Sequence, residues 1–302
     1  MNTITKAFDS AKANYSEKKI TVRKNMDFSQ NDIPKYWFAG SPFKTRVADA
    51  LQMTFPVGER YFIESVRAYR DDITDEQLKA EVKDFIMQEA QHGISHEQIN
   101  DLLRAQGMPI NRMEKTLKNI LNSHTKELSR EFNIAHTAAT EHLTALMAKA
   151  FFHYRSTMEG VDPNMRGLLA WHAVEEMEHR AVAFDVMKHA SDTKEIQRYT
   201  AMALVSTLMP IFTLTRAVIM LRVDGFSVLQ IARMMVSKDG LPWLFAKGGI
   251  LRGVATEYAD WYRRDFHPNM HPMVHNYQDW VAVYEKTGDP IEAGNAMWAA
   301  GY

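Results

Sequence analysis

Hydrophobic residues recur every three or four positions along most of this chain, and no alternating run of useful length interrupts them. This spacing is typical of amphipathic helices. It predicts a first long helix over residues 42–71, with a kink or break at Pro56. A capping box at residues 74–77 opens a second helix that ends near Gly107. The pattern therefore predicts an all-α fold.

A third helix is predicted over residues 111–160, with one interruption around residues 122–123. Asp162 and Pro163 suit the N-cap and the first position of a fourth helix, which runs to about Ser191. Shorter helices are predicted beyond these four, over residues 226–236, 241–263 and 274–299.

Residues 199–215 are apolar and carry no charge. At 17 residues, this segment is at the short limit for spanning a bilayer. We expect the region 199–222 to be a buried helix that packs on the other helices and helps to close a substrate cavity. Peripheral membrane contact is the alternative.

Each of the first four helices places polar residues on its apolar stripe. Glu59 lies on the first stripe and Glu141 on the third, whereas Glu64 and Glu178 fall off the stripes and are predicted to be solvated. The second and fourth stripes carry several polar residues each, namely Glu89, His92 and His96, and His172, Glu176 and His179.

Four carboxylates in one core need a shared cation, because an unpaired buried carboxylate is costly. Independent buried ion pairs are the alternative, but no Lys or Arg lies near the carboxylates on these stripes. Two helices hold Glu-x-x-His, which puts a carboxylate and an imidazole on one face, and the other two supply one Glu each. This is the ligand set of ferritin-like di-iron proteins. The predicted ligands of two metals are Glu59, Glu89, His92, Glu141, Glu176 and His179.

His172 lies on the same helix face as Glu176 and His179, so we predict it as a seventh ligand; a hydrogen-bonded core histidine is the alternative. Ligating imidazoles usually donate their other N–H to a carboxylate. Glu175 is the predicted partner of His92. His96 and Asp185 are predicted to support the ligands from a second layer.

The amino-acid composition limits which metals and partners the chain can bind. The chain has no cysteine among its 302 residues, so any metal must be held by nitrogen and oxygen donors, which suit iron and manganese. The cofactor prediction is two iron ions, with manganese or a mixed pair as alternatives. A net charge of −1 makes nucleic acid an improbable partner. The first 19 residues lack the apolar core of a secretory signal, so we expect a cytoplasmic protein, with membrane association left open.

Five strings carry a resemblance that covers most of the chain: Phe55-Pro-Val-Gly-Glu59, Gln88-Glu-Ala-Gln-His92-Gly, Thr140-Glu141-His142, Trp171-His172-Ala-Val-Glu175-Glu176-Met-Glu178-His179 and Asp265-Phe-His-Pro268. With them the chain resembles the bacterial family of predicted metal-dependent hydrolases. The spacing of His172, Glu176 and His179 is also similar to that in di-iron enzymes of the p-aminobenzoate N-oxygenase type. That second resemblance implies seven ligands, with His172 among them.

These patterns lead to three hypotheses about function. The first is an O2-activating oxidase or oxygenase that acts on a small hydrophobic or aromatic substrate and takes electrons from a reductase. The second is a hydrolase with a metal-activated water, which the absence of Asp ligands speaks against. The third is a non-catalytic iron-binding or ferroxidase protein. We expect one domain and a homodimer. The domain comprises an N-terminal arm (1–40), a four-helix di-metal bundle (41–192) and a C-terminal helical extension packed on it (193–302).

Overall fold

The computed structural model describes residues 20–246 and 250–302. Within these ranges the chain is helical and contains no strand beyond an isolated bridge between Phe38 and Val161. The prediction of an all-α fold is confirmed. The first 19 residues of the predicted arm lie outside the described ranges.

The first two predicted helices form much as expected. Helix α2 (Pro42–Gln52) is followed after two residues by α3 (Phe55–Arg67), so the predicted break falls just before Pro56. Helix α4 (Glu76–Ala105) begins where the side chain of Asp75 accepts the first free N–H groups of the helix.

The third predicted helix is interrupted later than the sequence indicated. Helix α5 (Ile110–Glu127) continues through residues 122–123, where Ser123 bonds back to the carbonyl of Asn119 and the helix tolerates both polar residues. The break comes at Leu128 and Ser129, and Ser129 caps α6 (Arg130–Phe152). The predicted position was wrong because the capping serine, Ser129, lies nearly two helical turns further on.

The fourth predicted helix is also divided, which the sequence did not indicate. Helix α7 (Pro163–His179) ends at a turn, and α8 (Val182–His189) continues the chain. Arg180 lies in this turn and donates to the carbonyl of His271, so a contact with the C-terminal region accompanies the break.

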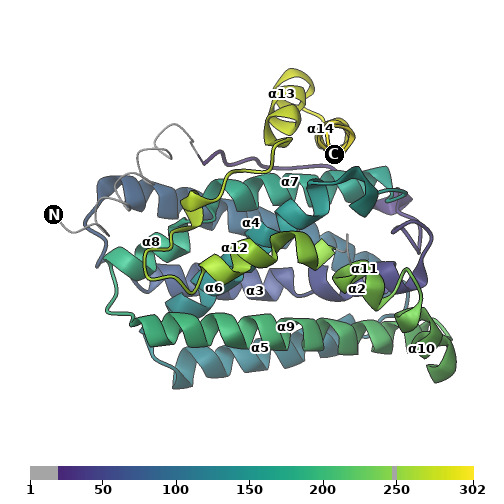
Figure 1. Cartoon of the computed structure of the whole chain (residues 1–302), viewed down its shortest axis with the longest axis horizontal. Coiled ribbons are helices and arrows are strands. Elements are labelled where there is room, and N and C mark those ends of the chain that lie inside the picture. The colour runs from purple at the N-terminus through teal and green to yellow at the C-terminus, as the bar shows by residue number, and fades with distance from the viewer. Residues whose placement is uncertain (1–19, 247–249) are drawn as a thin grey trace.

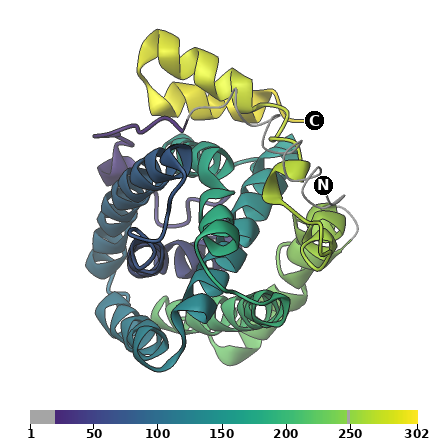
Figure 2. The same ribbon diagram turned by 90° about the vertical axis from the view of Figure 1, so that its left-hand side faces the viewer.

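The helices α3, α4, α6 and α7 contact one another in a closed ring: α3 lies against α4 and α6, and α7 lies against the same two. They run through the middle of the molecule in Figure 1, and Figure 2 views them nearly end on. This arrangement brings the four polar stripes of the sequence face to face.

Helix α9 (Glu195–Val223) packs on α6 and α2 along the lower edge of the molecule in Figure 1. It is the one helix in the described ranges that is long and apolar enough to cross a membrane, but only 33 % of its most apolar window is buried. The expected buried helix is therefore buried on one side only. It leads into α10 (Val228–Val236).

The C-terminal region is more broken than predicted. Instead of one helix over 241–263 there are the short elements α11 (Leu241–Phe245), η3 (Ile250–Val254) and α12 (Ala255–Asp260). Helices α13 (Tyr277–Thr287) and α14 (Pro290–Ala299) cover α7 at the top of Figure 1. Gly167 and Gly294 allow α7 and α14 to touch, since a Cβ on Gly294 would lie 2.7 Å from the Cα of Gly167.

Candidate metal centre

The ring of four helices brings all seven predicted ligands together in its core. Helix α3 supplies one of them, α4 two, α6 one and α7 three. Their donor atoms form two buried groups, in each of which all donors lie within 4.8 Å of one another. The carboxylate-rich group contains Glu89, Glu141, Glu176 and His179, and the histidine-rich group contains Glu59, His92 and His172.

In the carboxylate-rich group, the Nε2 atom of His179 is the centre of the contacts. It lies 3.1 Å from Oε1 of Glu89, 3.2 Å from Oε2 of Glu141 and 3.5 Å from Oε1 of Glu176. The same oxygen of Glu176 lies 2.9 Å from Nε2 of His172. Glu176 therefore joins the two groups, and the Thr144 hydroxyl donates to its other oxygen.

Several of these atoms are buried without a hydrogen-bond partner among the described residues. They are both carboxylate oxygens of Glu59, Glu89 and Glu141, together with Nδ1 of His92 and Nε2 of His179. Buried polar atoms in native proteins almost always have a partner. Oxygen and imidazole donors that converge in this way fit divalent metal ions, which would satisfy all of them at once.

The outward nitrogens of two histidines are held by neighbouring side chains. His92 places Nε2 3.1 Å from Oε2 of Glu175, the partner that the sequence predicted for it. His179 places Nδ1 2.8 Å from Oε1 of Gln88. In both rings the N–H points outward, so the lone pair of the other nitrogen points into the centre.

His172 is oriented in the same way by a chain of buried side chains. Its Nδ1 lies 2.6 Å from Nε2 of His96, and Nδ1 of His96 lies 3.1 Å from Oε1 of Gln52. Because the amide oxygen can only accept, His96 donates to Gln52 and accepts from His172. The lone pair on Nε2 of His172 is then directed at Glu176. His96 thus supports His172 from outside the ligand set.

The sequence missed Arg23, which belongs to the described part of the predicted arm. Its guanidinium lies 3.1 Å from Glu175 and 2.8 Å from Glu178, and both carboxylates are buried. The prediction that Glu178 is solvated was wrong, since Tyr277 also donates to it. The side of α7 that lies off the ligand stripe is covered by the arm and by α13, which a helical pattern cannot indicate. Glu64, in contrast, is exposed as predicted.

Asp185 does not support the ligands. Its Oδ1 lies 3.0 Å from Nε2 of His267, whose Nδ1 accepts the N–H of Asn269. The predicted role was wrong because the chain turns between α7 and α8, so Asp185 no longer continues the ligand stripe of α7. It instead fixes the segment Asp265-Phe-His-Pro268 to the bundle.

Burial raises the pKa of Glu59 well above its usual range, and repulsion from Glu89 adds to the effect. Burial and repulsion from Glu176 and Glu89 raise the pKa of Glu141 to about 8. Burial alone would also raise the pKa of Glu176, but without metal, when the inner nitrogens of His172 and His179 can carry protons, these two imidazoles hold that pKa well below its usual range. Without a cation the cluster must therefore hold protons, and metal ions would displace them.

Aromatic rings surround the histidines and restrict water. Phe55 packs edge-on against both His96 and His172, with ring centroids 4.7 and 4.8 Å away, and Phe85 packs against His179. Exposure is not uniform: Glu59, His172 and Glu176 are 3–6 % exposed, whereas the other four ligand candidates are 0–1 % exposed. The small exposed surface of the centre therefore belongs to Glu59, His172 and Glu176.

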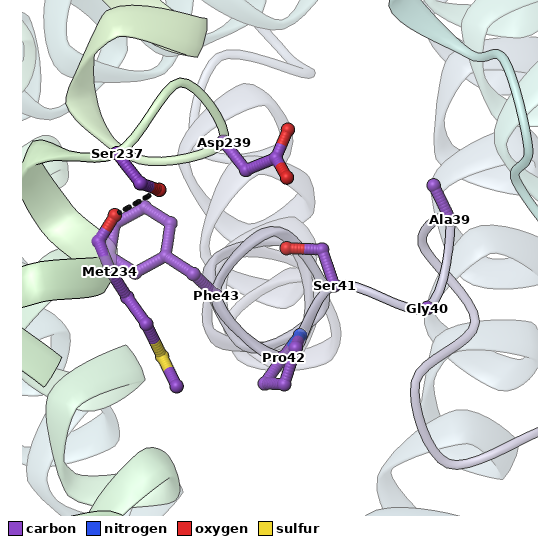
Figure 3. A pocket seen from close by; sticks show the side chains of 8 residues that line it. All are labelled: Ala39, Gly40, Ser41, Pro42, Phe43, Met234, Ser237 and Asp239. Atoms are coloured by element: carbon purple, nitrogen blue, oxygen red, sulfur yellow. Dashed lines mark hydrogen bonds between the residues drawn. The ribbon is translucent and has the colours of Figure 1, made fainter. Parts of the chain in front are cut away.

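A surface cavity of about 320 Å³ lies elsewhere, between the start of α2 and the end of α10. Figure 3 shows its lining, which includes Ser41, Pro42, Phe43 and Asp239 but none of the seven ligand candidates. Asp239 there forms an ion pair with Lys44. The convergence of unpartnered donors, rather than this cavity, marks the candidate functional site.

In the comparison with protein families, the model of the family described as predicted metal-dependent hydrolase matches residues 22–272. The chain belongs to this family, and the resemblance seen in its sequence is confirmed. No curated protein matches the chain, and no solved structure does.

The family corrects the first hypothesis about function. The interpretation as an O2-activating oxidoreductase is wrong, because the family to which the chain belongs is described as predicted metal-dependent hydrolases. The reason is chemical: glutamate and histidine donors with open metal positions serve water activation as well as O2 activation, so the ligand pattern does not distinguish them. The absence of Asp ligands was not a valid argument against hydrolysis.

Proposed function

We propose that this member of the predicted metal-dependent hydrolases cleaves an ester or phosphoester with water, at a two-metal centre enclosed by α3, α4, α6 and α7. The observation that carries the proposal is the convergence of buried, unpartnered carboxylate oxygens and imidazole nitrogens. The proposed ligands are Glu59, Glu89, His92, Glu141, His172, Glu176 and His179. We further propose that the four helices form a ferritin-like bundle.

The metals proposed are iron or manganese, which nitrogen and oxygen donors without thiolate suit. The four carboxylates of the two groups would balance the charge of two divalent ions, which is what so buried a cluster needs. When bound, such ions supply Lewis-acid polarisation of the scissile group and water activation near neutral pH.

The chain's own residues would keep this centre rigid and dry. Gln88, Glu175 and His96 fix the ring orientations of the three histidines, and Thr144 fixes the carboxylate of Glu176. Substrate and water would enter on the side of His172, Glu176 and Glu59, the three most exposed of the seven candidates. Gly93 leaves room for Glu59, since a Cβ on it would lie 3.4 Å from Oε2 of that carboxylate.

The test is hydrolysis of 4-nitrophenyl esters and phosphates under argon, by protein loaded with iron or manganese. We expect turnover that stops on chelation and is lost in Glu141→Gln but kept in Glu64→Gln, a matched change at an exposed site on α3. Turnover that is equal with and without metal, or equal in the two variants, would refute the proposal.

Other expectations stay predictions. They are a small hydrophobic substrate, a homodimer and a cytoplasmic location. The predicted reductase partner and the O2 co-substrate are withdrawn together with the oxidoreductase interpretation. The non-catalytic iron-binding or ferroxidase hypothesis stays the second alternative, since the same buried donors would hold iron in either case.

A further inference from the structure

Helices α9 and α10, which lie in the lower part of Figure 1, expose many large apolar side chains. Exposed fractions reach 55 % at Leu208, 54 % at Ile211 and 76 % at Val236. Monomeric soluble proteins rarely leave apolar patches of more than a few hundred Å² open. The exposed apolar side chains of the two helices are Ile196, Leu204, Leu208, Ile211, Ile219, Val223, Val228, Leu229 and Val236.

Polar side chains within this stripe form hydrogen bonds inside the helix or point inward. Thr207 and Thr215 bond back to the carbonyls of Ala203 and Ile211, so their hydroxyls do not need water. Arg216 is the one charged residue between residues 199 and 221, and it is turned inward. There it donates to the carbonyl of Phe212. The outer side of α9 is therefore apolar and uncharged over most of its length.

Basic residues border this apolar stripe. Figures 1 and 2 both place α5 beside α9 at the bottom of the molecule. The exposed charges of α5 are the basic side chains of Arg112, Lys115, Lys118 and Lys126 against one exposed acid, Glu127. At the other end of the stripe Arg222, Arg233 and Lys238 are exposed. The chain as a whole has a net charge of −1, so this basic border is a local feature.

We propose that the face formed by α5, α9 and α10 docks onto a lipid bilayer with anionic headgroups. Apolar side chains of α9 and α10 would enter the boundary between headgroups and acyl chains, while the basic border would bind the headgroups. The inference does not depend on the hydrolase proposal.

Helix α9 lies in the plane of the interface and does not span the bilayer. Its inner side is packed on α6 and α2, so it cannot be surrounded by lipid without opening the core. Arg198, on that inner side, donates to the carbonyls of Trp261 and Arg263. Docking therefore leaves the fold intact.

A second copy of the chain fits this face less well than a bilayer. A two-fold interface places the same patch against itself. The basic side chains of α5 would then lie against the same face of the partner, whose α5 exposes one acid, Glu127, to pair with them. An anionic surface complements the apolar stripe and the basic border together.

The experiment is co-sedimentation of the full chain with vesicles of phosphatidylcholine, alone or mixed equally with phosphatidylglycerol. We expect binding to the mixed vesicles, weakened by salt, and little binding to phosphatidylcholine alone. The double variant Leu208→Glu/Ile211→Glu should bind about tenfold more weakly or worse. Ile94→Glu on α4 is the matched control, since Ile94 is 56 % exposed, and it should bind like the unaltered protein.

The basic border is tested by Lys115→Glu/Lys118→Glu, which should also weaken binding by about tenfold. Helical circular dichroism of each variant establishes that it is folded. Failure of the unaltered protein to bind mixed vesicles would overturn the proposal, as would equal losses in the Ile94 and Leu208 variants. Two further results would also overturn it. One is a dimer in solution that dissociates in the Leu208→Glu/Ile211→Glu variant, which would make this face a protein interface. The other is membrane attachment that detergent reverses but alkaline carbonate does not, which would mean that the chain is inserted in the bilayer.

Discussion

The two groups of candidate ligands differ in charge and in access. The carboxylate-rich group has three carboxylates and one imidazole, and three of its four members are at most 1 % exposed. The histidine-rich group has one carboxylate and two imidazoles, and its Glu59 and His172 are 3 % and 6 % exposed. More negative charge and less solvent should bind a cation more tightly. We therefore expect a tightly held structural ion in the first group, and in the second a weaker ion that substrate can reach.

The largest effect should follow from Glu176→Ala, because this carboxylate is shared by both groups. We expect the variant to lose both metals, as measured by elemental analysis of protein expressed with iron. An unchanged metal content would show that the two groups do not depend on a common ligand.

Substitutions confined to one of the two groups should remove only the metal ion of that group. Glu141→Ala should empty the carboxylate-rich group, while His172→Ala should still fold and keep the ion there. Metal content and anomalous scattering from crystals of each variant would identify the remaining ion. If the His172→Ala protein holds no metal, the two groups do not bind their ions independently. If the distance from the His172 ring nitrogen to the metal in the unaltered protein is well beyond about 2.1 Å, His172 is a core histidine and not a ligand.

Metal affinity should depend on pH through the carboxylate-rich group. The pKa of Glu141, raised to about 8 by burial and by its carboxylate neighbours, means that it holds a proton below that pH. Metal binding must displace this proton, so apparent affinity should rise by at least about tenfold per pH unit up to about pH 8. Competition titrations with a chromophoric chelator measure this slope. It should fall by about one in Glu141→Gln, and an unchanged slope would contradict the assignment.

A smaller, indirect effect is expected at the histidine-rich group from Arg23→Ala. Removing this cation takes away a buried charge partner that Glu175 and Glu178 share, at a cost in unfolding free energy of about 3 kcal/mol. Glu175 positions His92, so metal affinity at that group should fall about tenfold. Thermal unfolding and metal titration check both, with Lys24→Ala as the exposed neighbouring control.

The smallest effect should come from Glu64→Ala on α3. The side chain is exposed, unlike Glu59 one and a half turns earlier, so metal content should not change and stability should change by at most about 0.5 kcal/mol. Loss of metal in this variant would mean that the wrong carboxylate of α3 was assigned to the centre.

The hydrophobic pattern determined much of this protein. A three-to-four-residue period predicted the all-α fold, and polar interruptions of that period identified the seven side chains that meet in the core. Both inferences are local, since a helix fixes which residues share a face. The strings around these residues also identified the family correctly. The reaction was misjudged because similar donors serve hydrolysis and oxidation alike.

Only the tertiary structure decided which neighbours the centre has. Arg23 reaches Glu175 across 152 residues of chain, and Asp185 reaches His267 across 82. The burial of Glu178 and the one-sided exposure of α9 likewise depend on which distant segments cover each helix. The periodic pattern of the sequence shows whether one side of a helix is apolar or polar, but not which segment of the chain packs against that side. Those contacts are set by how the helices pack, because the free energy of burial depends on the apolar area removed from water and not on position along the chain.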